Sequence, residues 1–254
     1  MRCFQRLWVL VTLGVLFAGV VAANVPESAF NKDPWPAAKE GPVKVFILAG
    51  QSNMQGHAAL RTLEYLIYNA ETAAEYQQWK DRDGRWVERR DVWVWTTDGN
   101  RSGNLKPGFG ASEMKMGPEL GFGWVMGEHL SEQVLLIKTC WGGRSVRRDF
   151  LPPSAEMPPA GQLAKELENA RKKDANVTMA DIKSRYGKAY RDMIAHVNDV
   201  LERLKEHFPA YDEKRGYELA GFVWFQGWND MVDGQQREEK YAAYMVRLGQ
   251  LIDD

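Results

Sequence analysis

One short run constrains the fold of this chain more than any other feature. Residues 43–48 are mostly apolar, with several β-branched side chains. One residue later comes the polar motif Gly50-Gln51-Ser52-Asn53. This pattern predicts a buried β-strand that delivers a serine to its carboxyl end. Open α/β folds place their ligand-binding and catalytic residues at the carboxyl ends of the strands. Ser52 is therefore a candidate nucleophile, which needs a base and an oxyanion hole from elsewhere in the chain.

The rest of the chain alternates between two kinds of hydrophobic pattern. Strands are predicted at residues 92–95, 134–138 and 219–225, and helices at residues 60–80, 118–131, 186–208 and 237–252. Gly- and Pro-rich segments at 97–117 and 149–161 are predicted loops. Alternating strands and helices predict a parallel sheet covered on both faces, which is a three-layer α/β/α sandwich. Because no repeat or linker interrupts residues 42–254, we expect one domain there.

The first residues have the composition of a targeting segment. Arg2 and Arg6 precede an apolar stretch at residues 7–21, and small residues follow at Ala22 and Ala23. This predicts a secretory signal peptide at residues 1–23, with an uncleaved or lipid-anchored segment as the alternative. Residues 24–41, rich in proline and small side chains, are then a linker. We expect a secreted or periplasmic protein without stable membrane association after cleavage.

Composition narrows the possible partners. Among 254 residues, 33 are Lys or Arg and 34 are Asp or Glu, which gives a net charge of -1 and no support for a nucleic-acid partner. Ten tryptophans weakly favour a carbohydrate ligand. No His or Cys pair has the spacing of metal ligands, so we expect no metal and no cofactor. Cys140 follows an apolar run and is predicted to be a buried small hydrophobic residue.

Two more predicted strands end in polar motifs that complement Ser52. The third strand leads into Gly142-Gly143-Arg144-Ser145, and the fourth into Gln226-Gly227-Trp228-Asn229-Asp230. The glycines allow backbone N–H groups to approach a substrate, and the amide side chains are possible oxyanion donors. Each motif alone is more typical of a turn or a helix cap. Together, at one edge of a parallel sheet, they predict an acyl-transfer site.

These motifs, with Gly117-Pro118-Glu119-Leu120 before a helix, resemble the SGNH hydrolase superfamily, and within it the sialate O-acetylesterase and acetyl-xylan esterase group. The resemblance implies a flavodoxin-like sandwich and metal-independent removal of acetyl groups from an acetylated carbohydrate. It implies Ser52 as the nucleophile and an oxyanion hole formed by the Ser52 and Gly143 N–H groups with either Gln226 or Asn229. The residues that it places near the substrate are Gln51, Asn53, Arg144 and Trp228.

The sequence departs from the family pattern at the residues that supply the catalytic base. The family carries an Asp-x-x-His block near its carboxyl end, and none of the four histidines here has an aspartate three residues before it. A last strand is also missing, and the sequence stops within a predicted helix. We therefore expect an incomplete carboxyl end, with the base beyond Asp254 and an exposed apolar sheet edge.

Several residues allow a second interpretation. His57 could approach the cleft, but a loop position explains it more simply. Glu119 is more typical of a helix first turn than of catalysis. Arg144 fits a substrate contact and a surface charge equally well, and Trp141 and Trp228 could stack on a sugar or pack in the core.

Three functions remain open at this stage. The leading one is a serine esterase that removes O-acetyl groups from sialate-type or xylan-type carbohydrate. The second is a catalytically incomplete, carbohydrate-binding remnant of such an esterase. The third keeps the fold and changes the ester to a lipid or small-molecule acyl group.

Overall fold

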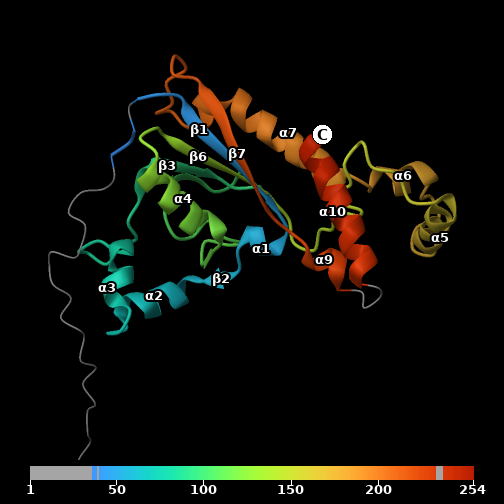
Figure 1. Cartoon of the computed structure of the whole chain (residues 1–254), viewed down its shortest axis with the longest axis horizontal. Helices are drawn as coiled ribbons and strands as arrows, with labels where there is room; N and C mark the ends of the chain where they lie inside the picture. The colour runs from blue at the N-terminus through green and yellow to red at the C-terminus, as the bar shows by residue number, and fades with distance from the viewer. Residues whose placement is uncertain (1–35, 39, 233–236) are drawn as a thin grey trace, which may run out of the picture.

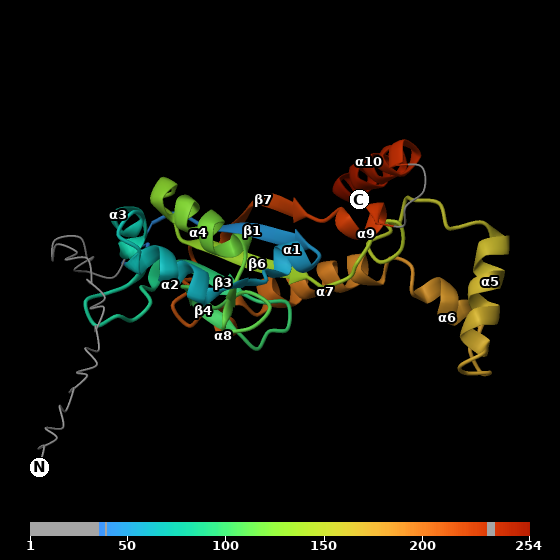
Figure 2. The same ribbon diagram turned by 90° about the horizontal axis from the view of Figure 1, so that it is seen from below.

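The computed structural model describes residues 36–38, 40–232 and 237–254 and shows an α/β/α sandwich with a small helical arm at one end (Figures 1 and 2). The predicted signal peptide at residues 1–23, and most of the predicted linker at 24–41, lie outside the described residues. Within the described part of the chain, no helix combines the length and hydropathy needed to cross a bilayer.

The elements follow one another along the chain as strands, helices and one short 3-10 helix, η2. Their bounds are β1 Val43–Gly50, α1 Ser52–Gln55, β2 Ala58–Ala59, α2 Leu60–Tyr68, α3 Ala73–Tyr76, η2 Gln77–Trp79, β3 Arg89–Trp95, β4 Ser102–Leu105, β5 Lys115–Met116, α4 Pro118–His129, β6 Val134–Cys140, α5 Ala160–Arg171, α6 Met179–Ser184, α7 Lys188–Glu202, α8 Leu204–His207, β7 Tyr217–Phe225, α9 Trp228–Met231 and α10 Arg237–Asp253.

The central sheet contains five strands in the order β4-β3-β6-β1-β7. All neighbouring pairs are parallel except β3 with β4. Gly50, the last residue of β1, lies opposite Cys140 in β6 and Phe225 in β7. The carboxyl ends of these three strands therefore meet at one level, as the sequence motifs predicted.

Side chains that alternate along the strands build a core on each face of the sheet. Val134 and Leu136 of β6 pack with α2 and α4, whereas Leu135 and Ile137 pack with α7 and α8. Every residue of β6 is buried, which is expected of a parallel strand covered on both faces. The predicted three-layer sandwich with a mainly parallel sheet is confirmed.

The helix predicted at residues 186–208 is interrupted at Arg203, between α7 and α8. Two other predicted segments differ from the structure. The helix predicted at residues 60–80 is divided into α2, α3 and η2, because the backbone of Asn69 is extended and its side chain binds locally. Asn69 Oδ1 accepts from Glu71 N at 2.9 Å, a local bond that competes with helix continuation. The loop predicted at residues 97–117 contains β4 and β5, which are too short and too polar for periodicity to detect.

Two other features stand out in the figures. Helices α5 and α6 form an arm that projects from the sandwich and has its own small core around Leu163, Ile182 and Tyr186 (Figure 2). Strand β7 lies at the sheet edge, where Leu219 and Phe225 are 58% and 48% exposed. The exposed apolar edge expected from the sequence is thus present among the described residues.

Candidate active site

Ser52 lies directly after β1, as the first residue of the short helix α1. Because it opens a helix, its backbone N–H has no partner within that helix. The Ser52 Oγ atom is 3.5 Å from Gln51 Nε2, and the side chain is partly exposed. Asn53, the next residue, is exposed. The strand therefore delivers the serine hydroxyl to the sheet edge, open to a ligand.

The turn after β6 is held from both sides by carboxylates. Gly143 has a φ of +73°, and a Cβ there would meet no atom within 4 Å, so only backbone conformation demands glycine. Asp149 accepts from Ser145 N at 2.9 Å. Asp230, in α9 just after β7, accepts from Val146 N at 2.8 Å and Arg147 N at 3.0 Å. The backbone around Gly143 is therefore fixed relative to β7.

A buried amide network joins the three strand ends. Gln51 is only 1% exposed, and its Oε1 accepts from Gln226 Nε2 at 3.1 Å and from Asn229 N at 3.3 Å. Gln226 Nε2 also lies 2.9 Å from Arg144 O and 2.7 Å from Asp230 Oδ2. Direct contacts thus join Gln51 after β1, the Arg144 backbone after β6, and Gln226 and Asn229 after β7.

The remaining predicted site residues occupy the surface around this network. Trp228 is 68% exposed at the start of α9, whereas Trp141 packs against Phe150 with ring centroids 6.0 Å apart. Arg144 pairs with Asp149 at 3.1 Å and remains partly exposed. Of the two tryptophans, Trp228 is therefore the exposed one, and Trp141 is the partly buried one.

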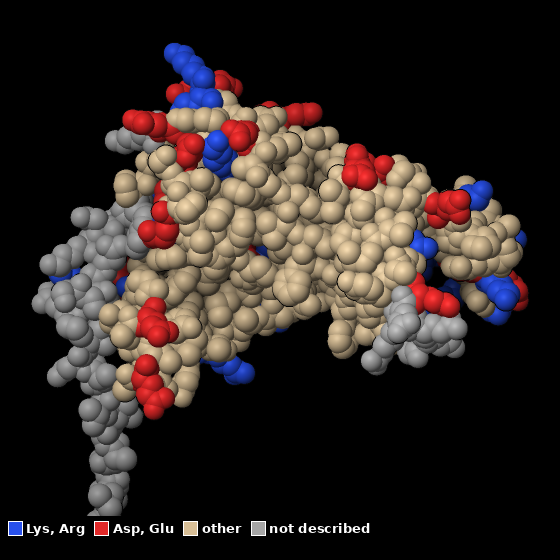
Figure 3. Space-filling view, viewed as in Figure 1, with Lys and Arg blue, Asp and Glu red and all other residues tan. Residues whose placement is uncertain are grey.

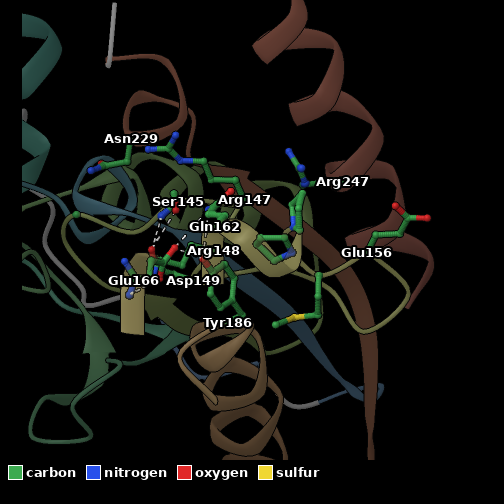
Figure 4. A pocket seen from close by; sticks show the side chains of 14 residues that line it. Ser145, Arg147, Arg148, Asp149, Glu156, Gln162, Glu166, Tyr186, Asn229 and Arg247 are labelled. Atoms are coloured by element: carbon green, nitrogen blue, oxygen red, sulfur yellow. Dashed lines mark hydrogen bonds and ion pairs between the residues drawn. The ribbon is translucent and has the colours of Figure 1, made fainter. Parts of the chain in front are cut away.

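A cleft of about 630 Å³ opens beside the network, between the sheet edge, the arm and α10 (Figure 4). Gly143 and Asn229 line it from the sheet edge, Tyr186 from the arm side and Arg247 from α10. Ser52 is not among its lining residues, but Asn229, whose backbone N–H contacts Gln51 beside the serine, is. Its volume is within the range of small-molecule sites.

The cleft has a mixed electrostatic lining. Tyr186 donates to Glu166 at 2.5 Å, and burial together with this carboxylate raises the pKa of Tyr186 to about 12. Glu166 also faces Arg148 at 3.8 Å. By contrast, the Arg247 side chain has no hydrogen bond or ion pair to another described residue. Arg247 as a residue is partly buried.

None of the four histidines bonds to Ser52. His57 is exposed and lies 3.1 Å from Lys115 Nζ, and His129 ends α4. His196 and His207 lie on α7 and α8, where burial lowers the pKa of each imidazole. Within the described residues, no carboxylate bonds to Ser52 Oγ either.

Glu119 has different surroundings from those that the sequence suggested, whereas Cys140 has the surroundings that were predicted. Glu119 is fully buried and ion-paired to Lys138 at 2.7 Å, so it is more than a first-turn residue of α4. Cys140 is buried, as predicted, and burial raises the pKa of its thiol. No cluster of three metal-ligating side chains occurs among residues 36–38, 40–232 and 237–254.

Sequence reasoning did not identify four residues that shape the site: Lys138, Asp149, Asp230 and Arg247. The sequence contained a usable indication for two of them, Lys138 and Asp230. Lys138 is a charge within a run otherwise buried, which already demands a partner. Asp230 belongs to a quoted motif, but its neighbours across the sheet edge are visible only in the fold. Asp149 and Arg247 carried no local pattern.

The family of the chain is evident from its sequence as a whole. The family model described as "SASA: carbohydrate esterase, sialic acid-specific acetylesterase" matches residues 42–254. The chain belongs to this family of carbohydrate esterases, which confirms the resemblance inferred from the motifs. No curated protein matches the chain.

Two solved structures are similar to the chain. An X-ray structure of a protein from Arabidopsis thaliana has 15% sequence identity and a TM-score of 0.45, and the match covers 84% of this chain and 67% of that one. A carbohydrate acetylesterase from Xanthomonas citri has 11% identity and a TM-score of 0.38, with 83% of this chain and 39% of that one covered. This chain thus spans well under half of the Xanthomonas protein.

Proposed function

We propose that this chain is a carbohydrate O-acetylesterase in which Ser52 is the nucleophile. Ser52 Oγ bonds to the acetyl carbonyl carbon, the sugar oxygen leaves with a proton, and water then releases acetate from acetyl-Ser52. The observation that carries the proposal is the Gln51 side chain, whose Oε1 contacts both Gln226 and Asn229 N. This contact places the serine beside the two other strand ends. Family membership supports the same chemistry.

For the oxyanion hole, we propose Asn229 in preference to Gln226. The two N–H groups of Gln226 Nε2 are already shared among Gln51, Arg144 and Asp230. The Asn229 side chain lines the cleft beside Gly143 and has no hydrogen bond to another described residue. It is therefore free to donate to a developing oxyanion, together with the N–H groups of Ser52 and Gly143.

The same contacts divide the predicted substrate-binding residues into two groups. Gln51 is buried and bonded, so we assign it to holding the strand ends together. Asn53, Arg144 and Trp228 are exposed or partly exposed around the serine, which suits contact with a sugar. An acetylated carbohydrate therefore remains the partner that we propose, in the secreted or periplasmic location predicted from residues 1–23.

Arg247 favours a sialate-type substrate over a xylan-type one. Arg247 is partly buried, lines the cleft and is unpaired among the described residues. Arginine binds carboxylates through paired N–H donors. A sialic acid carries a carboxylate, whereas an acetylated xylose unit does not. We propose that Arg247 binds this carboxylate.

A second function is favoured by the missing base. Since no histidine or carboxylate among the described residues bonds to Ser52 Oγ, this chain could bind acetylated carbohydrate without turning it over. This is the carbohydrate-binding alternative. It predicts sialic acid binding without Ser52-dependent acetate release.

One experiment separates the two functions. Acetate release from O-acetylated sialic acid and acetyl-xylan is measured with and without added imidazole, which supplies a diffusible base. The esterase proposal predicts release that falls about 10³-fold, or to background, in Ser52→Ala. Ser131→Ala, an exposed serine after α4, is the matched control and should be unchanged. Equal release from wild type and Ser52→Ala would exclude Ser52 as the nucleophile.

The substrate type is tested with Arg247→Met. Loss of a charged hydrogen bond of about 1.5–3 kcal/mol predicts roughly 10- to 100-fold weaker binding of sialic acid by calorimetry. Xylan oligosaccharide binding should not change, and Arg61→Met, on the exposed side of α2, should affect neither. Equal losses for both sugars would indicate a packing role for Arg247 instead.

A further inference from the structure

A fully buried ion pair lies beneath the helix that begins with Ser52. Lys138, in β6, and Glu119, at the start of α4, have side chains that are 2% and 1% exposed, with Nζ and Oε2 2.7 Å apart. Charges with so little access to water are unusual in a protein core. Neither residue contacts the cleft beside Gly143.

Each polar atom of this pair is used. Lys138 Nζ donates to Glu119 Oε2, to Gln55 O at 3.0 Å and to Phe109 O at 2.7 Å, which accounts for all three ammonium hydrogens. Glu119 Oε1 accepts from Gly117 N at 2.8 Å. The pair therefore joins the end of α1, the segment after β4 and the start of α4.

This arrangement is poorly explained by stability alone. Removing two charges from water is costly, and replacing a buried ion pair by packed apolar side chains is often neutral or stabilising. What apolar side chains cannot replace is the hydrogen bond to Gln55 O. Gln55 ends α1 one turn after Ser52, and the neighbouring Gly56 O accepts from Ala111 N at 2.7 Å. The ammonium thus fixes the far end of the helix that carries the nucleophile.

We infer that Lys138 and Glu119 are positioning residues, which hold α1 so that Ser52 points at the substrate. The expected effect of the ion pair on the reaction rate rests on the proposed role of Ser52. The expected effect of the ion pair on the position of α1 rests on geometry alone. A displacement of about 1 Å at a reacting group can reduce a rate by about 10²-fold. Loss of the pair should therefore impair Ser52 without unfolding the protein.

The test uses the apolar pair Lys138→Met with Glu119→Leu, and the wild-type chain beside it. Amide hydrogen exchange of the peptide covering residues 51–56 should become at least about tenfold faster while global melting changes by only a few degrees. Reaction of Ser52 with a fluorophosphonate probe should slow by roughly 10- to 100-fold. Most of this loss should be a lower maximal rate of labelling, and the probe concentration that gives half of that rate should change less.

Arg89 and Asp91 provide a matched control. They form another buried pair, with Arg89 Nη2 2.6 Å from Asp91 Oδ2. This pair lies in β3 and, among the described residues, has no hydrogen bond to α1. Arg89→Met with Asp91→Leu should leave both exchange at residues 51–56 and labelling of Ser52 unchanged. If this control has the same effect as the test pair, the inference is wrong.

The outcomes separate the inference from the proposed function. Unchanged exchange at residues 51–56 in the test pair would overturn the inference. A wild-type chain that does not react with the probe would count against the proposed nucleophile, while the exchange measurement would still decide the role of the pair. Should the double variant not fold, Glu119→Gln keeps the side-chain shape but removes the charge and one of the two acceptor oxygens, so that only one of the bonds from Gly117 N and Lys138 Nζ can form. It should still speed exchange at residues 51–56 several-fold, and an unchanged value would overturn the inference.

Discussion

Gly143 shows how much of the candidate site depends on backbone geometry at a single residue. Its φ of +73° suits glycine, and the space around a Cβ is empty. An alanine at this position would meet no steric clash, but its backbone would be strained by about 1–2 kcal/mol. The turn should shift to relieve this strain. The orientation of the Gly143 N–H group should change accordingly.

This leads to a prediction with a closely matched control. Gly84 has a φ of +75° and equally empty surroundings, but it lies in a distant turn. Gly143→Ala and Gly84→Ala should each lower the free energy of unfolding by about 1–2 kcal/mol in urea titrations. Only Gly143→Ala should reduce Ser52-dependent acetate release, by about 10- to 100-fold. Equal release from the two variants would remove Gly143 from the oxyanion hole.

The residues of the candidate site were predictable from sequence to different degrees. Ser52, Gly143 and Asn229 follow predicted strands, and parallel strands align their carboxyl ends, so their proximity could be inferred. The hydrogen bond between Gln226 and Gln51 could not be inferred, because it depends on which other groups the amide hydrogens bond to in the folded chain. Arg247 comes from α10, whose placement across the cleft no local pattern encodes.

Among the elements, strand β7 is the most exposed part of the sheet. It pairs with β1 along one side only, and the face shown in Figure 3 is nearly free of charged side chains over this region. The strand carries one charged residue, Glu218, near its start, and the rest of this long edge is a template for pairing with other chains. We therefore expect the described part of the chain to self-associate through β7.

Leu219→Lys tests this expectation. Leu219 is 58% exposed on β7, so a lysine should change the free energy of unfolding by no more than about 0.5 kcal/mol. Light scattering during concentration should show much less aggregate than wild type. Val125→Lys places the same charge on α4 at a residue that is also 58% exposed, and should aggregate like wild type. Similar improvement in both variants would point to net charge, not the edge.

Elements were predicted well where packing on the sheet sets the pattern. The four long strands and helices α4, α7 and α10 bury one face or both, so periodicity located them within a few residues. The break at Asn69 depends on side-chain hydrogen bonds, and α5 and α6 pack mainly on each other, with little apolar patterning. These parts required the structure.

For the whole molecule, the histidines predict how stability depends on pH. Burial lowers the pKa of His196 and of His207 in the folded chain. An unfolded chain has ordinary histidine pKa values of about 6.5, so below this pH it binds more protons than the folded chain. Stability should therefore be highest above about pH 6.5, should fall as the pH drops from there toward the lowered values, and should level off below them.

Urea unfolding at about pH 7.5 and about pH 5 measures this difference, because carboxylates with lowered pKa values, such as Asp98 and Asp199, act mainly below about pH 4. The combined variant His196→Gln with His207→Gln should lose most of the difference between the two pH values. If that variant retains the full difference, other groups control the pH dependence.

The central claim concerns Ser52 as an acyl-accepting nucleophile, and trapping the acyl group tests it most directly. The chain is mixed with p-nitrophenyl acetate and imidazole, quenched in acid, digested and analysed by mass spectrometry. The peptide that contains Ser52 should gain one acetyl group in the wild type and none in Ser52→Ala. Acetylation confined to lysines, or equal at this peptide in both proteins, would contradict the account.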